Sequence, residues 1–265
     1  MQRQWLMTPP PFDDPAETFH VASKLSMWMS SSATGPYSYE LATDPDALEQ
    51  LGRAHPHYIS SEVYPLASAG GATPVGDLLR RRHSAAGFGQ NAVTFDSFSR
   101  ILNESACITE AHGRGAPSAG ALYPIDIYLC VNNVEGLTAG VYALDPYGAS
   151  LHRLTVDRDP RSFLQECLVF QNLADNSAFH VFFVGSFVRQ RIKYGQRAYR
   201  FALIEAGHIA QAMIMCALEE NVVSCPVGGF IDKQVDDLLC LDGVEQSVVY
   251  SVAFGSGQAS DEVVE

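Results

Sequence analysis

An apolar run over residues 197–221 constrains the fold of this chain more than any other segment. Its Ala, Leu, Ile and Met residues fall on every side of the helix that their spacing predicts, and few polar residues interrupt them. A helix without a polar face has to be covered by the rest of the protein. We therefore predict a long, central, buried helix, in which Glu205 and His208 satisfy each other by a hydrogen bond.

Shorter patterns predict the elements around this helix. Residues 75–82 suit a short helix, and Thr94 is a good N-cap for another. That second helix is expected to bury four side chains on one face, which are Phe95, Phe98, Ile101 and Leu102. The expected strands are 125–131, a hairpin of 141–144 with 151–156, 180–187 and 247–254. Because helices and strands mix without strict β-α-β alternation, the expected class is α+β, with a mixed sheet flanked by helices around the buried helix.

Composition excludes several classes of protein. The formal net charge is −13 and the sequence has no lysine-rich run, so binding to nucleic acid or to an anionic membrane is not expected. No stretch reaches eighteen uncharged apolar residues, and the first residues lack the apolar core of a signal peptide. The six cysteines form no C-x-x-C pair, so no metal site is expected and a reduced, cytoplasmic protein is the simplest account.

Residues 1–75 differ in composition from the remainder. They contain the runs Pro9-Pro10-Pro11 and Ser30-Ser31-Ser32, and a segment rich in Ala, Gly and Ser precedes Pro74. Such composition is typical of loops and linkers. We interpret residues 1–75 as a partly ordered N-terminal extension and residues 76–265 as the main domain.

The densest positive charge is Arg80-Arg81-Arg82, followed by His83-Ser84. Guanidinium groups and a hydroxyl at a helix end would suit a phosphate, through charge-assisted hydrogen bonds. A solvated helix C-terminus, where cations favour the helix dipole, explains the run equally simply. From these residues alone the second interpretation is favoured.

Two glycine-containing segments suit the close approach of a ligand. Residues 113–124 place small residues and two prolines before a strand, and Pro226-Val227-Gly228-Gly229 follows the long helix. Backbone without bulky side chains can contact a flat ring or present N–H groups to it. Tight structural turns remain the alternative for both. The Gly113-x-Gly115 pattern is not a dinucleotide fingerprint, because it precedes a strand and does not join a strand to a helix.

Lys193 and Tyr194 precede the long helix in a basic stretch that continues with Arg197, Tyr199 and Arg200. Lysine and tyrosine both transfer protons when their surroundings are suitable. A basic flank of a helix is the simpler interpretation of these residues taken alone.

Taken together and in this order, these segments resemble the nitroreductase superfamily. Residues 82–88 resemble the family's R-[RH]-S-x-[RK]-x-F, which holds the phosphate of FMN, although Ala86 stands at the second basic position. Residues 117–124 resemble the P-S-x-x-x-x-x-P loop beside the isoalloxazine ring, and residues 226–229 the P-[IV]-x-G loop over its reactive edge. After Phe254-Gly255 there is no Lys or Arg of the kind that nitroreductases often place on the phosphate.

Within this superfamily, the sequences of these segments most resemble the SagB-type dehydrogenases. The segment P-S-A-G-A-L-Y-P at 117–124 is similar to theirs, as is K-Y-x-x-R-x-Y-R at 193–200 followed by Glu205-x-Gly207. Thr18-Phe19-His20-x-Ala22-Ser23-Lys24 resembles an N-terminal signature of that branch.

This resemblance implies a nitroreductase-like fold with FMN as cofactor over residues 76–265. The implied substrates are peptides whose Cys, Ser or Thr residues form thiazoline or oxazoline rings, which are oxidised to thiazole or oxazole, with oxygen as final acceptor. Lys193 and Tyr194 are implied to remove the ring proton. The implied FMN contacts are Arg82, His83, Ser84, Pro117, Ser118, Ala119, Gly120, Ala121, Pro226, Val227, Gly228 and Gly229.

The resemblance also implies a homodimer with flavin between its subunits and a cyclodehydratase as partner protein. Three other functions remain open at this point. They are an NAD(P)H-dependent nitroreductase or quinone reductase, an oxidase that serves a peptide synthetase, and a non-catalytic flavin-binding subunit of a cyclodehydratase complex.

Overall fold

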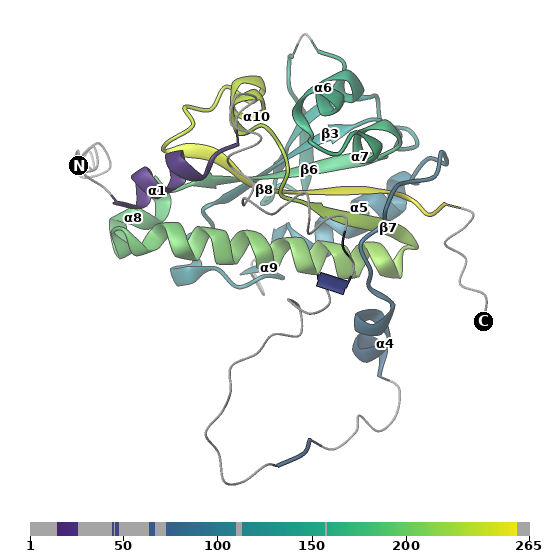
Figure 1. Cartoon of the computed structure of the whole chain (residues 1–265), viewed down its shortest axis with the longest axis horizontal. Coiled ribbons are helices and arrows are strands. Elements are labelled where there is room, and N and C mark those ends of the chain that lie inside the picture. Colours follow the sequence, from purple (N-terminus) through teal and green to yellow (C-terminus); the bar gives the residue numbers. More distant parts are fainter. Residues whose placement is uncertain are drawn as a thin grey trace.

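A six-stranded sheet separates two layers of helices in the computed structural model (Figure 1). The structure describes residues 15–25, 44, 46–47, 64–66, 73–109, 113–156 and 158–258. In spatial order the strands are β5 (Ser150–Arg153), β4 (Gly140–Asp145), β3 (Ile125–Val131), β6 (Phe179–Ser186), β8 (Gln246–Ser256) and β7 (Val222–Val227). The helices of the main domain include α5 (Phe95–Ser105), α6 (Pro160–Cys167), α8 (Val188–Tyr194), α9 (Arg197–Glu219) and α10 (Asp232–Leu238). Shorter or peripheral helices are α1 (Pro15–Ser23), α4 (Pro74–Arg81) and α7 (Gln171–Asp175).

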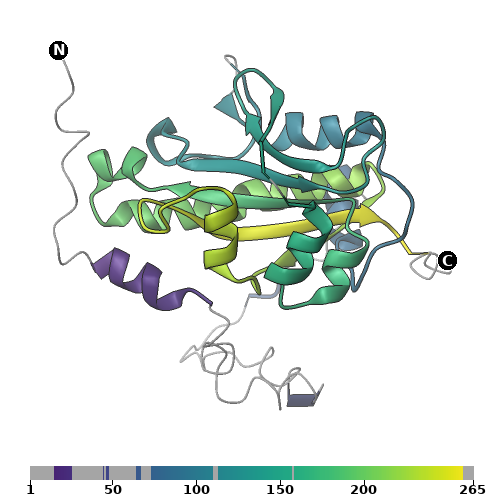
Figure 2. The same ribbon diagram turned by 90° about the horizontal axis from the view of Figure 1, so that it is seen from above.

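The central strand β6 is buried along its whole length because helices cover both faces of the sheet. On one face its side chains join those of α5 and α9 in a core that includes Phe98, Phe183 and Met213. On the other face they join α6, α7 and α10 in a second core that includes Phe163 and Phe182. Figure 1 shows the two helical layers above and below the strands, and Figure 2 shows the same arrangement from above, with one layer in front of the strands and the other behind them. The expected α+β class, with a sheet flanked by helices, is confirmed.

Each pairing between these six strands is antiparallel, whereas the sequence led us to expect a mixed sheet. The reason lies in the connection between β6 and β7, which runs through α8 and α9. These two strands point the same way, as in a parallel crossover, but β8 lies between them and pairs antiparallel with each. No two strands of like direction are therefore neighbours in the described sheet.

The long helix α9 forms where the apolar run predicts it, but it is buried on one face only. Its buried residues follow a helical spacing from Ala198 to Ala217, while Leu203 and Ile204 are 37% and 54% exposed. The prediction of a helix buried on all sides is therefore wrong for the single chain. α9 belongs to the outer layer beside α5, so that the sheet covers only its inner face (Figure 1).

By length and composition α9 is also long and apolar enough to cross a membrane, alone among the helices of the described residues. The core helix of a soluble protein meets the same criterion. Here its inner face packs on the sheet and carries the buried carboxylate of Glu205, which pairs with Arg114.

The other local predictions mostly hold. α4 and the strands β3, β4, β5, β6 and β8 lie where the sequence predicts them to within a few residues. Thr94 caps α5 by accepting a hydrogen bond from the N–H of Ser97. Phe98, Ile101 and Leu102 are buried as predicted, but Phe95 is 48% exposed because it lies in the first turn of α5, at the rim of the core.

Part of the N-terminal extension is described. Residues 15–25 form α1 and the two residues that follow it, and α1 contacts the main domain through His20, which is 3% exposed. The runs Pro9-Pro10-Pro11 and Ser30-Ser31-Ser32 lie outside the described residues.

His180 on β6 generates a prediction about stability at acid pH. Its ring is fully buried, and neither nitrogen has a hydrogen-bond partner among the described residues. Burial lowers the pKa of His180 from 6.5 to about 3. Below about pH 6.5 the unfolded chain binds a proton that the folded chain excludes. The free energy of unfolding therefore decreases as the pH is lowered, until about pH 3.

His180→Leu should remove this dependence while filling a similar volume. The difference in the free energy of unfolding, variant minus wild type, should be about 2 kcal/mol more positive at pH 5 than at pH 7.5. Urea denaturation at the two pH values measures it. Equal pH dependence in both proteins would show that His180 is not the source.

Candidate functional site

The loop that leads into β3 is strained. Ser118 to Tyr123 contains the short helical turn η2 (Ala119–Ala121), and Gly120, Ala121 and Tyr123 have φ values of 68°, 53° and 45°. Positive φ at a residue other than glycine costs on the order of 1 kcal/mol or more. The Ser118 hydroxyl closes the loop by accepting a hydrogen bond from the N–H of Tyr123 at 2.9 Å. Strain of this kind is usually kept where it serves a site.

Gly120 in this loop meets the two predicted proton-transfer residues. A β-carbon added at Gly120 would lie 2.6 Å from the Tyr194 hydroxyl oxygen and 2.8 Å from the Lys193 Nζ. Both side chains belong to the end of α8, and the Lys193 ammonium lies 5.2 Å from the centre of the Tyr194 ring. The structure therefore brings Lys193 and Tyr194 against the Ser118–Tyr123 loop. A larger residue at position 120 would displace these two side chains and would be strained by the φ of 68°.

Two more side chains of α8 hold the same loop. Gln190 is fully buried and its amide donates to the carbonyl of Ala119 at 3.4 Å. Arg189 donates to the carbonyl of Tyr123 at 3.0 Å and forms a two-pronged ion pair with Asp126 at the start of β3. These polar, directional contacts fix α8 relative to the loop.

A buried ion pair anchors the loop from the inside. Arg114, in the short strand β2 (Gly113–Arg114) that pairs with β1 (Ile108–Thr109), approaches Glu205 of α9 to 3.2 Å, and both side chains are at most 1% exposed. Arg114 also donates to the carbonyls of Ala106 and Ile125, at 2.9 and 3.3 Å. Its guanidinium lies 5.3 Å from the centre of the Tyr123 ring.

The two members of this pair influence each other's ionisation. Burial raises the pKa of Glu205, and the Ser118 hydroxyl and the Arg114 charge oppose that shift. Burial lowers the pKa of Arg114, and the Glu205 charge opposes that shift.

Sequence reasoning missed this pair. It paired Glu205 with His208, which is wrong, because Glu205 is buried against Arg114 while His208 is exposed on the outer face of α9. The available signal was an acidic residue in the interior of the apolar helix, far from Glu219 at its end, together with one arginine in a run of small residues, Gly113 to Gly120.

The residues predicted to bind phosphate gather at the other end of α9. Arg82 caps α4, and its side chain and that of His83 border a small cleft lined by Ile214 and Leu218 of α9. The chain then passes Ser84, which is exposed, and the N–H of Ala85 donates to the carbonyl of Ser224 on β7 at 2.9 Å. This segment thus lies along the edge of β7.

Pro226 and Val227 end β7, and Gly228 and Gly229 form the turn that follows. A β-carbon added at Gly228 would meet no atom within 4 Å, so its backbone is open to a ligand. Pro226 borders a hollow of about 290 Å³ between one side of α9 and the strands β7 and β8. The other residues that line the hollow are mostly small or apolar. They are Leu203, Ala206, Gly207, Ala210, Gln211, Ile214, Val249 and Tyr250.

The predicted site residues therefore form two groups within one chain. Lys193, Tyr194 and the Ser118–Tyr123 loop lie at the N-terminal end of α9, whereas Arg82 and His83 lie beside Ile214 and Leu218. At 1.5 Å per residue these positions are about 25 to 30 Å apart along the helix. One chain alone does not bring the two groups together.

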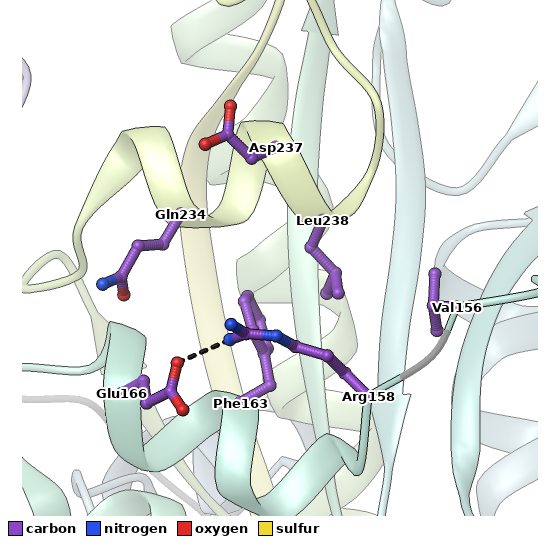
Figure 3. A pocket seen from close by; sticks show the side chains of 7 residues that line it. All are labelled: Val156, Arg158, Phe163, Glu166, Gln234, Asp237 and Leu238. Carbon is purple, nitrogen blue, oxygen red and sulfur yellow. Dashed lines mark hydrogen bonds and ion pairs between the residues drawn. The ribbon is translucent and has the colours of Figure 1, made fainter.

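Another hollow, of about 330 Å³, lies on the opposite side of the sheet between α6 and α10 (Figure 3). Arg158 crosses its floor and pairs with Glu166, while Gln234 and Asp237 border it from α10. None of the predicted site residues lines this hollow. Among the described residues, no three His, Cys, Asp or Glu side chains gather as metal ligands.

Comparison with known proteins agrees with this arrangement. The model of the nitroreductase family matches residues 79–256, which include both groups of site residues. The chain belongs to the nitroreductase family.

Two curated relatives support this membership. The protein named nitroreductase MJ1384 of Methanocaldococcus jannaschii is 29% identical over 164 residues, which cover 62% of this chain and 82% of that protein. The microcin B17-processing protein McbC of Escherichia coli is 29% identical over 150 residues. The match covers 49% of this chain and 49% of McbC, so the chain spans about half the length of that relative.

Solved structures share the fold. A chain of the Escherichia coli microcin synthetase McbBCD complex, solved with truncated pro-MccB17 bound, matches with a TM-score of 0.75 at 21% identity, over 93% of this chain and 94% of that one. A nitroreductase structure from Anabaena variabilis matches with a TM-score of 0.61 at 24% identity, over 69% of this chain and 38% of that one.

The buried pair generates a prediction about stability. Arg114→Met leaves Glu205 buried without a counter-charge, which should cost about 3 to 5 kcal/mol of unfolding free energy. Arg189→Met is the matched control, because the Arg189 side chain is 42% exposed and its pair with Asp126 should contribute about 1 kcal/mol or less. Urea denaturation of both variants gives the comparison. Similar losses in the two would contradict a special role for the buried pair.

Proposed function

We propose that the protein is an FMN-dependent dehydrogenase that oxidises thiazoline or oxazoline rings in a peptide to thiazole or oxazole. The observation that carries this proposal is the contact of the Lys193 Nζ and the Tyr194 hydroxyl with Gly120. It places two groups capable of proton transfer on the loop that resembles the flavin loop of the SagB-type branch. The relationship to McbC, a protein that processes microcin B17, supports a peptide substrate.

The residues present fit a flavin. The hollow beside Pro226 is lined by small and apolar side chains, which suits a flat ring, and the backbone of Gly228 is open toward solvent. Ala85, which follows Ser84, bonds to Ser224. At about 3.4 Å per residue, Ser224 lies about 13 Å from Gly228 along the chain. A ring with a phosphate on a short carbon chain can bridge that distance, with Arg82 and His83 at the phosphate end.

When bound, FMN would accept the hydride that leaves the azoline ring. The protein has to remove the accompanying proton from the ring carbon next to the carbonyl. Lys193 and Tyr194 are the groups we propose for this step, with Lys193 as the base and Tyr194 as its neighbour in proton transfer. The contacts of Gln190 and Arg189 with the loop hold α8, and with it the Lys193 amine, at a fixed place relative to that loop.

The site is proposed to form between two copies of this chain. In an isologous dimer with antiparallel α9 helices, the N-terminal end of one helix lies beside the C-terminal end of the other. Lys193 and Gly120 of one subunit would then approach the Arg82 segment and the hollow of the second. The exposed apolar residues Leu203 and Ile204 supply the contact surface that such a dimer needs.

A partner protein that cyclises the peptide is also proposed, since the azoline has to be formed before it is oxidised. The matching McbC structure belongs to a complex named microcin synthetase McbBCD. An NAD(P)H-dependent nitroreductase is the second candidate function, favoured by the family match over residues 79–256.

The proposed base gives the sharpest test of function. Lys193→Ala should leave FMN bound and reducible by dithionite, but should lower the rate of azoline peptide oxidation by roughly 10²-fold or more. Tyr194→Phe should lower it less. Lys233→Ala on α10 is the matched control, because Lys233 is exposed and forms an ion pair with Asp237 of the same helix. This variant should retain the wild-type rate.

Near-normal turnover by Lys193→Ala would show that another group removes the proton. Loss of FMN from this variant would instead assign Lys193 to cofactor binding. Rapid reduction by NADPH with turnover of nitroarenes, and no effect on azoline peptides, would favour the second candidate function.

The proposed dimer predicts a link between assembly and cofactor. The purified protein should be yellow, release FMN on denaturation, and scatter light as a dimer with two FMN molecules. Ile204→Glu places a charge on the outer face of α9 and should yield a monomer that loses FMN. Phe95→Glu alters a similarly exposed apolar residue elsewhere and should remain a yellow dimer. A monomer that retains flavin would contradict the shared site.

A further inference from the structure

Residues 15–25 form what we call the α1 strap, which consists of α1 and the two residues after it. It contains the signature Thr18-Phe19-His20-x-Ala22-Ser23-Lys24 and lies outside residues 79–256, the region that the family model matches. Figure 1 shows α1 beside the corner where α8 meets α9. Its contacts give this signature a structural meaning.

The middle of the strap contacts both sides of that corner. His20 Nδ1 lies 2.9 Å from the hydroxyl of Tyr199, in the first turn of α9, and Phe19 meets the same ring edge-on. The His20 ring also packs edge-on against Phe187, the residue that precedes α8. Burial lowers the pKa of His20 to about 4, so the ring is neutral near pH 7. Phe187 and Tyr199 pack on each other, with ring centres 5.0 Å apart.

Charged contacts at both ends of the strap complete this attachment. Glu17 forms an ion pair with Arg191 of α8 at 2.8 Å, and both side chains are mostly buried. Lys24 donates to Asp236 of α10 at 2.7 Å and to the carbonyl of Gly243 at 2.6 Å. The N–H of Leu25 donates to the carboxylate of Asp232 at 2.8 Å.

The helix that the strap contacts is too short to hold its own position. α8 has seven residues, and isolated helices of that length are not stable in water. On one side it is held by the Ser118–Tyr123 loop, through Arg189 and Gln190. Arg191, between them and Lys193 in sequence, pairs with Glu17 of the strap and with Glu245 just before β8. α8 thus lies between the loop and the strap, and Lys193 and Tyr194 are at its end.

We propose that the α1 strap is a positioning element for catalysis, in which His20 acts through Tyr199 and Glu17 through Arg191 to fix α8. The strap thereby keeps the Lys193 Nζ and the Tyr194 hydroxyl against Gly120. Its contacts described above are with Tyr199, Phe187 and Arg191 and with α10, so it acts on the position of these two groups. This inference rests on the proposed function only where it concerns the rate of azoline oxidation.

The test compares two isosteric replacements of the buried histidine. Asn keeps a polar atom at the place of the His20 Nδ1, whereas Leu does not. His20→Leu and Tyr199→Phe should each lower kcat for an azoline peptide about tenfold or more, with KM and FMN content unchanged. His20→Asn should stay within about threefold of the wild type, and the double variant His20→Leu/Tyr199→Phe should be no worse than the poorer single variant.

Charge replacements test the end of the strap in the same way. Lys24→Met removes the anchor on Asp236 and should lower kcat, whereas Lys233→Met, on the exposed surface of α10, should not. Equal losses in His20→Leu and His20→Asn, or wild-type kcat in both His20→Leu and Lys24→Met, would overturn the proposal.

A readout that does not depend on activity separates this inference from the proposed function. Hydrogen–deuterium exchange followed by mass spectrometry should rise in peptides covering residues 188–199 of His20→Leu and Lys24→Met, while peptides from α5 keep wild-type exchange. If the wild-type protein does not oxidise azolines, the proposed function is wrong, and the exchange measurement still decides whether the strap positions α8. Unchanged exchange at 188–199, or an equal rise throughout the protein, would overturn the positioning role.

Discussion

Arg114 and Glu205 form a charged contact in the protein interior on which the arrangement of the site depends. A buried guanidinium is tolerated only when its donors are used, and Arg114 uses them on Glu205 and on the carbonyls of Ala106 and Ile125. Those partners belong to the end of α5, the start of β3 and the middle of α9. One side chain therefore fixes three elements at one point, and the loop between Arg114 and β3 has little choice of path. That path carries Gly120 to the end of α8.

Strain in the same loop is balanced by contacts from several directions. Ala121 and Tyr123 have left-handed backbone conformations, and their cost in free energy has to be offset by contacts with other parts of the protein. The Ser118 hydroxyl, the Arg189 guanidinium and the aromatic contact with Arg114 supply the compensation. Such a loop has one well-defined shape, and a flat cofactor or substrate that rests on it meets a surface prepared in advance.

Much of the fold could be predicted because its signals are local. The capping of α5 by Thr94 and the alternation in β3 depend on neighbours in sequence. What failed depends on neighbours in space. Phe95 fits the apolar pattern of α5, yet the buried part of that helix begins one turn later, at Phe98. The helix α9 is apolar on all sides, yet the rest of the chain covers only one face of it. Motifs identified the candidate residues Arg82 and Lys193, but nothing in the sequence places them at opposite ends of one helix. The partner of Glu205 is 91 residues away and carries no periodic signal.

The contacts of the α1 strap have a consequence for the order in which the protein acquires its shape during translation. His20 meets a residue 179 positions later, and Lys24 meets residues 212 and 219 positions later. A ribosome adds roughly 5 to 20 residues per second, so roughly 10 to 40 seconds separate the synthesis of Lys24 from that of its partner carboxylate. Throughout this interval the strap has been made but its docking surface has not. The corner that holds Lys193 and Tyr194 is therefore completed near the end of synthesis, after the sheet strands that precede it have had time to pair.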